Sequence, residues 1–254
     1  MTNYKSLILF FLIFGLIGLV TGCDNDDVEP DPKEDSNPKD NSEVGSYSSN
    51  YVHCGEPSKV VDVINPITGK TWMDRNLGAS RAATSATDEE AYGDLYQWGR
   101  SSDGHQCRNS KIEPKVSSSV TPDHGDFILS YMNYGYNWHM PPKNDDLWQG
   151  VNGINNPCPS GYRLPTEAEF SAERRSWTTD NYAGAFASPL KLTLAGTRFY
   201  ANGELQSVGT LGNYWSSTTT ENFAKTLIFH NNNNKANIGG TSRAYGNSVR
   251  CIKD

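Results

Sequence analysis

Hydrophobic and polar positions divide the chain into three unlike parts. Residues 7–20 form an uncharged apolar run, residues 24–43 contain almost no apolar side chain, and residues 51–254 mix apolar, aromatic and glycine positions. The apolar run is too short for an ordinary membrane span and is typical of the core of a secretory signal. The polar segment cannot bury enough surface to offset the entropy of ordering, so we expect it to be disordered. Residues 51–254 are long enough for one hydrophobic core and are expected to form one domain.

Short apolar alternations separated by turn residues dominate this domain, and they favour strands and loops over helices. Residues 60–73 predict two strands around a turn at 65–69, and residues 190–209 predict a hairpin at Asn202-Gly203, where both residues tolerate positive φ. Residues 213–218 and 224–230 predict a further strand pair, and residues 247–254 a last strand. Residues 101–157 show little regular pattern and are expected to be rich in loops.

One helix is well marked. Thr166 can cap its first turn while Glu169, three residues later, reaches back to form a capping box, and Pro165 ends the preceding segment. Phe170 and Trp177, seven residues apart, are expected to face the core.

The end of the apolar run resembles the lipobox of bacterial lipoproteins. Lys5 supplies a basic head, and the small residues Thr21 and Gly22 directly precede Cys23. The resemblance implies that residues 1–22 are a signal peptide and that Cys23 is lipidated and begins the mature protein. Residues 23–50 then form an acidic tether, and the membrane is a partner through the lipid anchor. An uncleaved signal anchor and an ordinary secretory signal are the alternatives.

The acidity of the chain lies in the tether. The formal net charge is −7, and residues 24–43 account for all of it with nine carboxylates against two lysines. The domain is therefore near neutral and has no basic stripe, which argues against nucleic acid as a partner. The acidic run is either a solvated spacer or an address for surface export, which it resembles in lipoproteins of Bacteroidota-type bacteria. We expect an outer-membrane lipoprotein exposed at the cell surface.

Five ordered blocks carry a family resemblance. They read TWMDRNLGASR (71–81), YGDLYQWGR (92–100), CPSGYRLPTEAEF (158–170), YWSSTT (214–219) and YGNSVRCIKD (245–254). Together they resemble the Fibrobacter succinogenes major paralogous domain, a family of exported bacterial proteins. The RLPTEAE and VRC blocks also resemble the formylglycine-generating enzymes. That similarity implies an α+β, C-type-lectin-like fold: a mixed, twisted sheet with few helices and long loops.

The mature domain holds four cysteines, an even number that in an exported protein indicates two disulfides with three possible connectivities. In lectin-like folds a cysteine near the first helix commonly bridges to the last strand. The resemblance therefore implies a Cys158–Cys251 pair, which leaves Cys54 with Cys107. Free thiols are the alternative.

The sequence argues against catalysis. Formylglycine-generating enzymes hold copper(I) with two cysteines upstream of their terminal block, and residues 159–250 contain no cysteine. His105 with Cys107, and the trio Asp123, His124 and Asp126, are weak candidates for a nucleophile or a metal, for which disulfide and turn roles are simpler. Glu167 and Glu169 are explained by the helix cap, and the calcium-binding tripeptides of C-type lectins are absent. We expect no enzyme activity, no cofactor and no metal.

A binding surface is the remaining function. Aromatic residues make up 11% of the chain, with six tryptophans, and planar rings can stack on sugars while Asn satisfies hydroxyls. Trp72, Trp98 and Trp215 are expected in the core. The candidate ligand residues are Trp148, Asn152, Asn231 and Asn233, with a polar hairpin tip as the alternative for the last two.

We therefore expect a binding or adhesion protein with a glycan or a surface protein as its ligand. A structural or assembly subunit of a surface fibre or envelope complex is the first alternative. A divergent enzyme on the sulfatase-modifying scaffold is the second.

The predicted location is tested by limited proteolysis of intact cells that express the full-length chain. We expect cleavage between Cys23 and Tyr51 to release a folded domain, identified by mass spectrometry, because a disordered tether outside the cell is open to protease. Protection that is lost only when the outer membrane is opened contradicts surface exposure and favours an envelope-assembly role.

Overall fold

The computed structural model describes residues 46–131, 136–232 and 234–254. These residues fall within one compact unit, Asn41–Asp254. The signal segment 1–22, Cys23, most of the tether and the candidate ligand residue Asn233 lie outside the described residues. The interpretations of those residues, and the domain boundary at 51, stay predictions.

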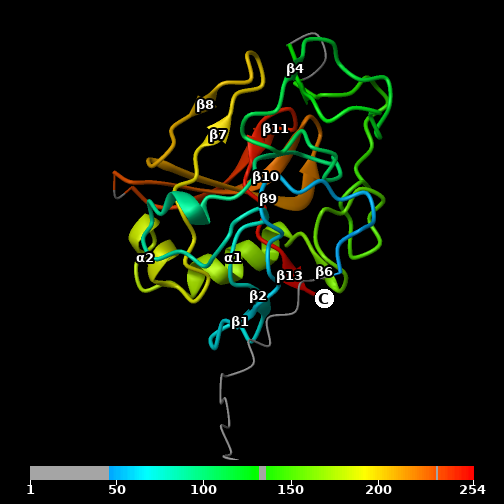
Figure 1. The fold of residues 1–254 in the computed structure, drawn as a ribbon. Helices are drawn as coiled ribbons and strands as arrows, with labels where there is room; N and C mark the ends of the chain where they lie inside the picture. The colour runs from blue at the N-terminus through cyan, green and yellow to red at the C-terminus, as the bar shows by residue number, and fades with distance from the viewer. Residues whose placement is uncertain (1–45, 132–135, 233) are drawn as a thin grey trace, which may run out of the picture. The chain divides into compact units, whose positions relative to one another are not determined.

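The fold is mixed α+β, rich in short strands and poor in helices (Figure 1). The helices are α1 (Glu167–Arg175), α2 (Tyr182–Ala187) and the 3-10 turn η1 (Glu89–Ala91). The strands are β1 (Asp62–Ile64), β2 (Thr71–Met73), β3 (Tyr96–Gln97), β4 (Ile112–Glu113), β5 (Phe127–Ile128), β6 (Tyr162–Arg163), β7 (Thr197–Arg198), β8 (Leu205–Gln206), β9 (Leu211–Thr220), β10 (Phe223–His230), β11 (Asn237–Ser242), β12 (Gly246–Asn247) and β13 (Ile252–Lys253). None of the helices in the described part has the length and hydrophobicity that a bilayer crossing requires.

The described residues form three sheets of three or four strands and one two-stranded sheet. Strands β9, β10 and β11 form an antiparallel sheet with β10 in the centre, and a second sheet has the order β3-β12-β7-β8. A third has the order β1-β2-β13-β6, and β4 pairs with β5 in parallel. Figure 1 shows α1 beside β9 and β10. The described part of residues 101–157, which excludes 132–135, contains the two short strands β4 and β5 and is otherwise loop, as the irregular pattern predicted.

The predicted hairpins are confirmed. Strands β1 and β2 pair across a turn in which the Asn65 carboxamide oxygen accepts a hydrogen bond from the Ile67 amide at 2.9 Å. Strands β7 and β8 pair across Asn202-Gly203, and Gly203 has φ +72°, a conformation that glycine adopts without strain. Strands β9 and β10 form the predicted pair.

The prediction of one last strand over residues 247–254 is wrong, because β12 and β13 belong to different sheets. The residues between them bond to loops and neighbouring strands: the Val249 carbonyl accepts from the Leu77 amide, and the Cys251 carbonyl from the Met73 amide, each at 3.0 Å. The pattern also missed α2, whose cap is the Asn181 side chain.

Helix α1 has the predicted capping box, in which the Thr166 hydroxyl and the Glu169 carboxylate each accept from the other residue's amide. Phe170 is fully buried. Trp177 lies two residues past the helix and packs edge-on against Phe229 of β10, with ring centroids 6.0 Å apart. These contacts place α1 against one face of the β9–β11 sheet.

Two disulfides join distant parts of the chain, Cys54–Cys107 and Cys158–Cys251. They are the pairs expected from the sequence. Because they close loops of 53 and 93 residues, each contributes about 4 to 5 kcal/mol in the chain-entropy model. The core roles expected for Trp72, Trp98 and Trp215 are confirmed, since all three are buried.

A buried polar network surrounds Arg250. Its Nε and Nη2 donate to the Asn76 carboxamide oxygen at 3.2 and 2.8 Å, and its Nη1 donates to the Leu190 carbonyl at 2.5 Å. The Asn76 amide nitrogen lies within 3.4 Å of the Tyr214 hydroxyl, which donates to the Thr193 carbonyl at 2.9 Å. Burial lowers the pKa of Arg250 to about 10, so the guanidinium is charged at neutral pH.

Replacing Asn76 by Ala tests this network. The change leaves two buried donors of a charged group without an acceptor, so we expect the free energy of unfolding to fall by about 2 to 4 kcal/mol in urea titration. Asn152→Ala, the same change at an exposed residue, is the control and should stay within about 0.5 kcal/mol of the parent chain. Equal stability of the two variants contradicts a structural role for the network.

Candidate functional site

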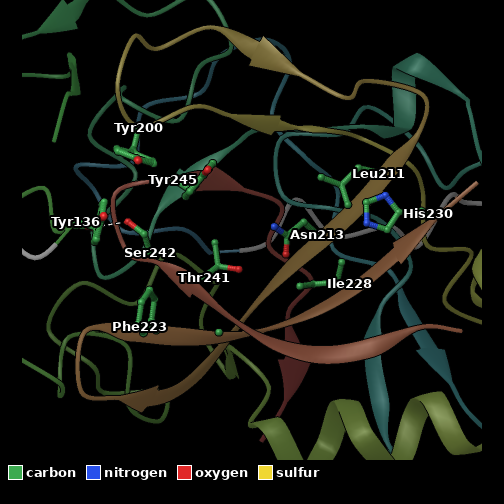
Figure 2. A pocket seen from close by; sticks show the side chains of 11 residues that line it. Tyr136, Tyr200, Leu211, Asn213, Phe223, Ile228, His230, Thr241, Ser242 and Tyr245 are labelled. Atoms are coloured by element: carbon green, nitrogen blue, oxygen red, sulfur yellow. Dashed lines mark hydrogen bonds between the residues drawn. The ribbon is translucent and has the colours of Figure 1, made fainter. Parts of the chain in front are cut away.

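A hollow of about 520 Å³ lies on the face of the β9–β11 sheet opposite α1. Strand alternation produces it: Leu227 and Phe229 of β10 pack into the core, while Ile228 and His230 point to the hollow. Figure 2 shows Asn213 of β9 and Thr241 of β11 beside Ile228 on the sheet surface. We call this hollow the sheet cleft, and its volume is in the range of small-ligand sites.

Three tyrosines line one end of the sheet cleft (Figure 2). The Tyr200 ring meets the Tyr136 ring and the Tyr245 ring edge-on, with centroids 5.5 and 5.0 Å apart. Tyr200 follows β7 and Tyr245 precedes β12, so the second sheet positions both residues. All three rings are partly exposed, so they can offer a face to a ligand.

Hydrogen bonds to β11 fix the third tyrosine. The Tyr136 carbonyl accepts from the Ser242 hydroxyl, drawn as a dashed line in Figure 2, and from the Ala244 amide at 3.2 Å. The end of the sheet cleft that the tyrosines line is therefore hydrogen-bonded to the β9–β11 sheet, which forms the floor of the cleft.

Asn213 is the polar group at the floor of the sheet cleft. It is 6% exposed, and its carboxamide oxygen has no hydrogen-bond partner within the described residues. A buried amide oxygen left unsatisfied costs about 1 to 3 kcal/mol, so a donor that reached this oxygen would stabilise the folded chain. Thr241 adds a hydroxyl that shares one hydrogen bond with Thr226 at 2.9 Å.

The sheet cleft is lined by neutral side chains and by the imidazole of His230. Its lining contains tyrosine, phenylalanine, aliphatic, amide and hydroxyl side chains, and no Asp, Glu, Lys or Arg. Burial raises the pKa of Tyr245, so this phenol stays neutral at physiological pH. The arrangement can stack on an apolar ligand face and exchange hydrogen bonds with neutral polar groups.

The residues proposed from the sequence do not form this site. Trp148 is fully buried, and its indole nitrogen donates to the Asn155 carbonyl at 2.9 Å, so the prediction that it contacts ligand is wrong. Asn152 is exposed and does not line the sheet cleft. Asn231 is exposed and directly follows His230 at the edge of the cleft, whereas Asn233 lies outside the described residues.

Sequence reasoning missed Asn213, Thr241 and the three tyrosines. Asn213 opens the NYWSST segment that predicted a strand, and alternation along that strand gives Asn213 and Tyr214 opposite faces. This alternation was the feature of the sequence from which the orientation of Asn213 could have been predicted. Nothing in the sequence brings Tyr136 and Tyr200 next to Tyr245.

The alternative catalytic candidates have structural partners. Cys107 is in a disulfide, as expected, and His105 is fully buried. The His105 Nε2 accepts from the Gln97 amide at 2.9 Å, so its Nδ1 carries the proton and donates to Asp103 at 2.6 Å. Across the described ranges, no group of three His, Cys, Asp or Glu residues is arranged to hold a metal ion.

Comparison with known proteins found no matching family model, no matching curated protein and no matching solved structure. The chemistry of the sheet cleft is therefore the basis on which a function can be assigned.

The burial of His105 predicts a pH dependence of stability. Burial, with the charge of Arg100, lowers the pKa of His105 from 6.5 to about 4. Between these values the unfolded chain binds a proton that the folded chain does not. We therefore expect the free energy of unfolding to fall by about 2 to 3 kcal/mol as pH drops from the higher value to the lower one.

His105→Gln is the comparison for this experiment, since Gln can still accept from the Gln97 amide but does not titrate. The slope of unfolding free energy against pH should be shallower in the variant over this window. The pKa of His139 is also lowered by burial, so the difference between the two slopes isolates His105. Identical slopes contradict the assignment of a neutral, buried His105.

Proposed function

We propose that this chain is a lipid-anchored, non-catalytic binding protein of the cell surface, built on a C-type-lectin-like domain, and that its ligand is a neutral carbohydrate held in the sheet cleft. The unpartnered amide of Asn213, on the floor of an uncharged hollow lined by tyrosines, is the observation that carries this proposal.

A sugar matches the cleft group by group. Pyranose rings have an apolar C–H face that stacks on aromatic rings, and their hydroxyls donate and accept hydrogen bonds. The Asn213 amide and the Thr241 hydroxyl offer both donors and acceptors next to the tyrosine end. No Asp, Glu, Lys or Arg side chain lines the cleft, so a charged ligand would have none of them as a counter-ion. Burying a charge without a counter-ion is costly.

A non-catalytic role is supported by what the reactive side chains already do. Cys54, Cys107, Cys158 and Cys251 are bonded in pairs, so none offers the thiolate that copper chemistry needs. Glu169 accepts two hydrogen bonds from Arg163, each at 2.9 Å, and these bonds with the helix cap lower its pKa to about 2. This carboxylate is held for structure and is a poor proton donor.

The cell-surface and lectin-like parts of the proposal come from the sequence. The lipobox-like residues before Cys23 and the acidic tether support a lipid anchor with an extended spacer. The five ordered sequence blocks support membership of the Fibrobacter succinogenes major paralogous domain family. The strand-rich α+β fold and the Cys158–Cys251 disulfide are compatible with the lectin-like fold that this resemblance implies.

The carbohydrate proposal is tested by screening the full-length chain, purified in detergent, on a glycan array. We expect binding to neutral glycans and a loss of affinity of about tenfold or more on Asn213→Val, because the variant removes every hydrogen bond of the amide. Tyr200→Leu should weaken binding by about two- to tenfold through lost stacking, and Tyr200→Phe should retain most of it.

Asn152→Val is the matched control, because it makes the same change at an exposed residue outside the cleft. Asn213→Val should fold with stability equal to or above that of the parent chain, since it removes an unsatisfied buried group. Absence of neutral-glycan binding contradicts the proposal, as does binding that Asn213→Val leaves intact. Stable co-purification with envelope proteins in that case favours the structural alternative.

A further inference from the structure

A second hollow, of about 530 Å³, shares no residue with the sheet cleft. Its walls come from four segments of the chain, which contribute residues 54–56, Gly78 and Ser80, Glu89, Glu90, Gly93 and Asp94, and residues 108–109. The Cys54–Cys107 disulfide joins the first segment to the residue directly before the last, so these two segments are held at a fixed separation. We call this hollow the Asp94 pocket.

Asp94 has a carboxylate with no partner. The residue is 5% exposed, and its Oδ2 makes no hydrogen bond within the described residues. The side chain lies directly against Gly78, where an added Cβ would stand 2.2 Å from the Asp94 Cγ. A glycine at position 78 is therefore required for the carboxylate to occupy this place, and both Gly78 and Asp94 belong to the lining of the pocket.

Arg108 lies in the same pocket and does not form an ion pair with Asp94. Its Nε donates to the Gly93 carbonyl at 2.7 Å, and its Nη2 donates to the Ala195 carbonyl at 3.0 Å. Its guanidinium stands 5.5 Å from the centre of the Tyr92 ring. The cation is thus committed to backbone oxygens, and it leaves the hydrogen-bonding capacity of Asp94 unused.

The rest of the lining adds negative charge. Glu56, Glu89 and Glu90 line the pocket, and of these Glu90 forms an ion pair with Arg81 at 2.8 Å. A carboxylate without donors inside a predominantly acidic pocket favours a cation that carries N–H groups.

We propose that the Asp94 pocket is a binding site for a primary alkylammonium group, which donates its N–H bonds to the Asp94 carboxylate. The site is separate from the carbohydrate site proposed above. An ammonium suits the geometry better than a metal ion, because no three acidic, histidine or cysteine side chains converge in the described part of the chain. The ammonium can come from a free amine or from a lysine side chain, which have this chemistry in common.

The ionisation of Asp94 makes the binding depend on pH. Burial raises the pKa of Asp94 to about 7, and Arg108 opposes the rise. The other titratable groups that face or couple to Asp94 are Glu56, Glu89, Glu90, Tyr47, Tyr51 and Tyr96. Only the ionised carboxylate attracts an ammonium, so binding to the protonated form requires Asp94 to release its proton. The affinity should therefore fall about tenfold from pH 8 to pH 6.

The experiment is calorimetric titration of the full-length chain in detergent with n-butylammonium at constant ionic strength. We expect one saturable site with a dissociation constant on the order of 1 mM, as is reasonable for a fragment of this size. Tetramethylammonium has the charge without the N–H donors and should bind at least about tenfold more weakly. 1,5-Diaminopentane and N-acetyl-lysine methylamide then distinguish a free amine from a lysine side chain, according to which binds more tightly.

Asp94→Asn should abolish the binding of n-butylammonium. The variant removes a buried charge that has no partner, so it should fold at least as well as the parent chain. Glu204→Gln, at an exposed carboxylate outside the pocket, is the matched control and should bind normally. Three results each overturn the proposal: no saturable binding at pH 8, equal binding by Asp94→Asn, or equal affinity for tetramethylammonium. The comparison of probes and of pH uses the parent chain alone, so it decides the question even if a variant fails to fold.

Discussion

The guanidinium of Arg250 is buried with no carboxylate at ion-pair distance in the described chain, so its N–H donors must be satisfied by neutral oxygens. Asn76 and the carbonyls of Met73 and Leu190 supply them, and these residues belong to parts of the chain that are far apart in sequence. Asn76 also reaches the Tyr214 hydroxyl on β9. The network holds the Tyr214 side chain toward the interior and so determines which face of β9 is buried. Because neighbouring side chains of a strand alternate, Asn213 then points to the opposite face. The floor of the sheet cleft thus depends on a buried charge that lies outside the cleft.

Two of the buried polar atoms that lack a hydrogen-bond partner belong to residues that line hollows. The central charge of Arg250 has acceptors at every nitrogen, whereas Asn213 and Asp94 keep buried oxygens without partners and line hollows. Each such oxygen lowers stability by about 1 to 3 kcal/mol. Buried side-chain atoms of Trp72, Asn137, Arg243, Asn247 and Ser248 also lack partners in the described chain, but these residues line neither hollow. The location of Asn213 and Asp94 in a hollow, together with the missing partner, is what favours a functional role for these two residues.

Short-range features of the fold could be predicted from the sequence. The capping box of Thr166 and Glu169 and the Asn202-Gly203 turn depend on residues within four positions of each other, so their patterns are visible in a single segment. The cysteine pairing followed from resemblance to lectin-like folds. The positions of Trp148 and Asn213 could not be predicted, because the burial of an indole and the isolation of an amide depend on strands and loops that meet only in the folded chain. The sequence offered Trp148 as a ligand-contacting ring, but neighbouring carbonyls already hold its only donor.

Strand β13 occupies an interior place in its sheet, between β2 and β6, although both of these strands precede it in the chain. During synthesis β1 and β2 therefore emerge long before the strand that completes their hydrogen bonding, and β6 also waits for it. This sheet cannot be completed until β13 has been made. The edges of β2 and β6 remain unpaired until almost the whole domain has emerged. A chaperone that covers unpaired strand edges would therefore be needed for longer than in a fold built from neighbouring hairpins.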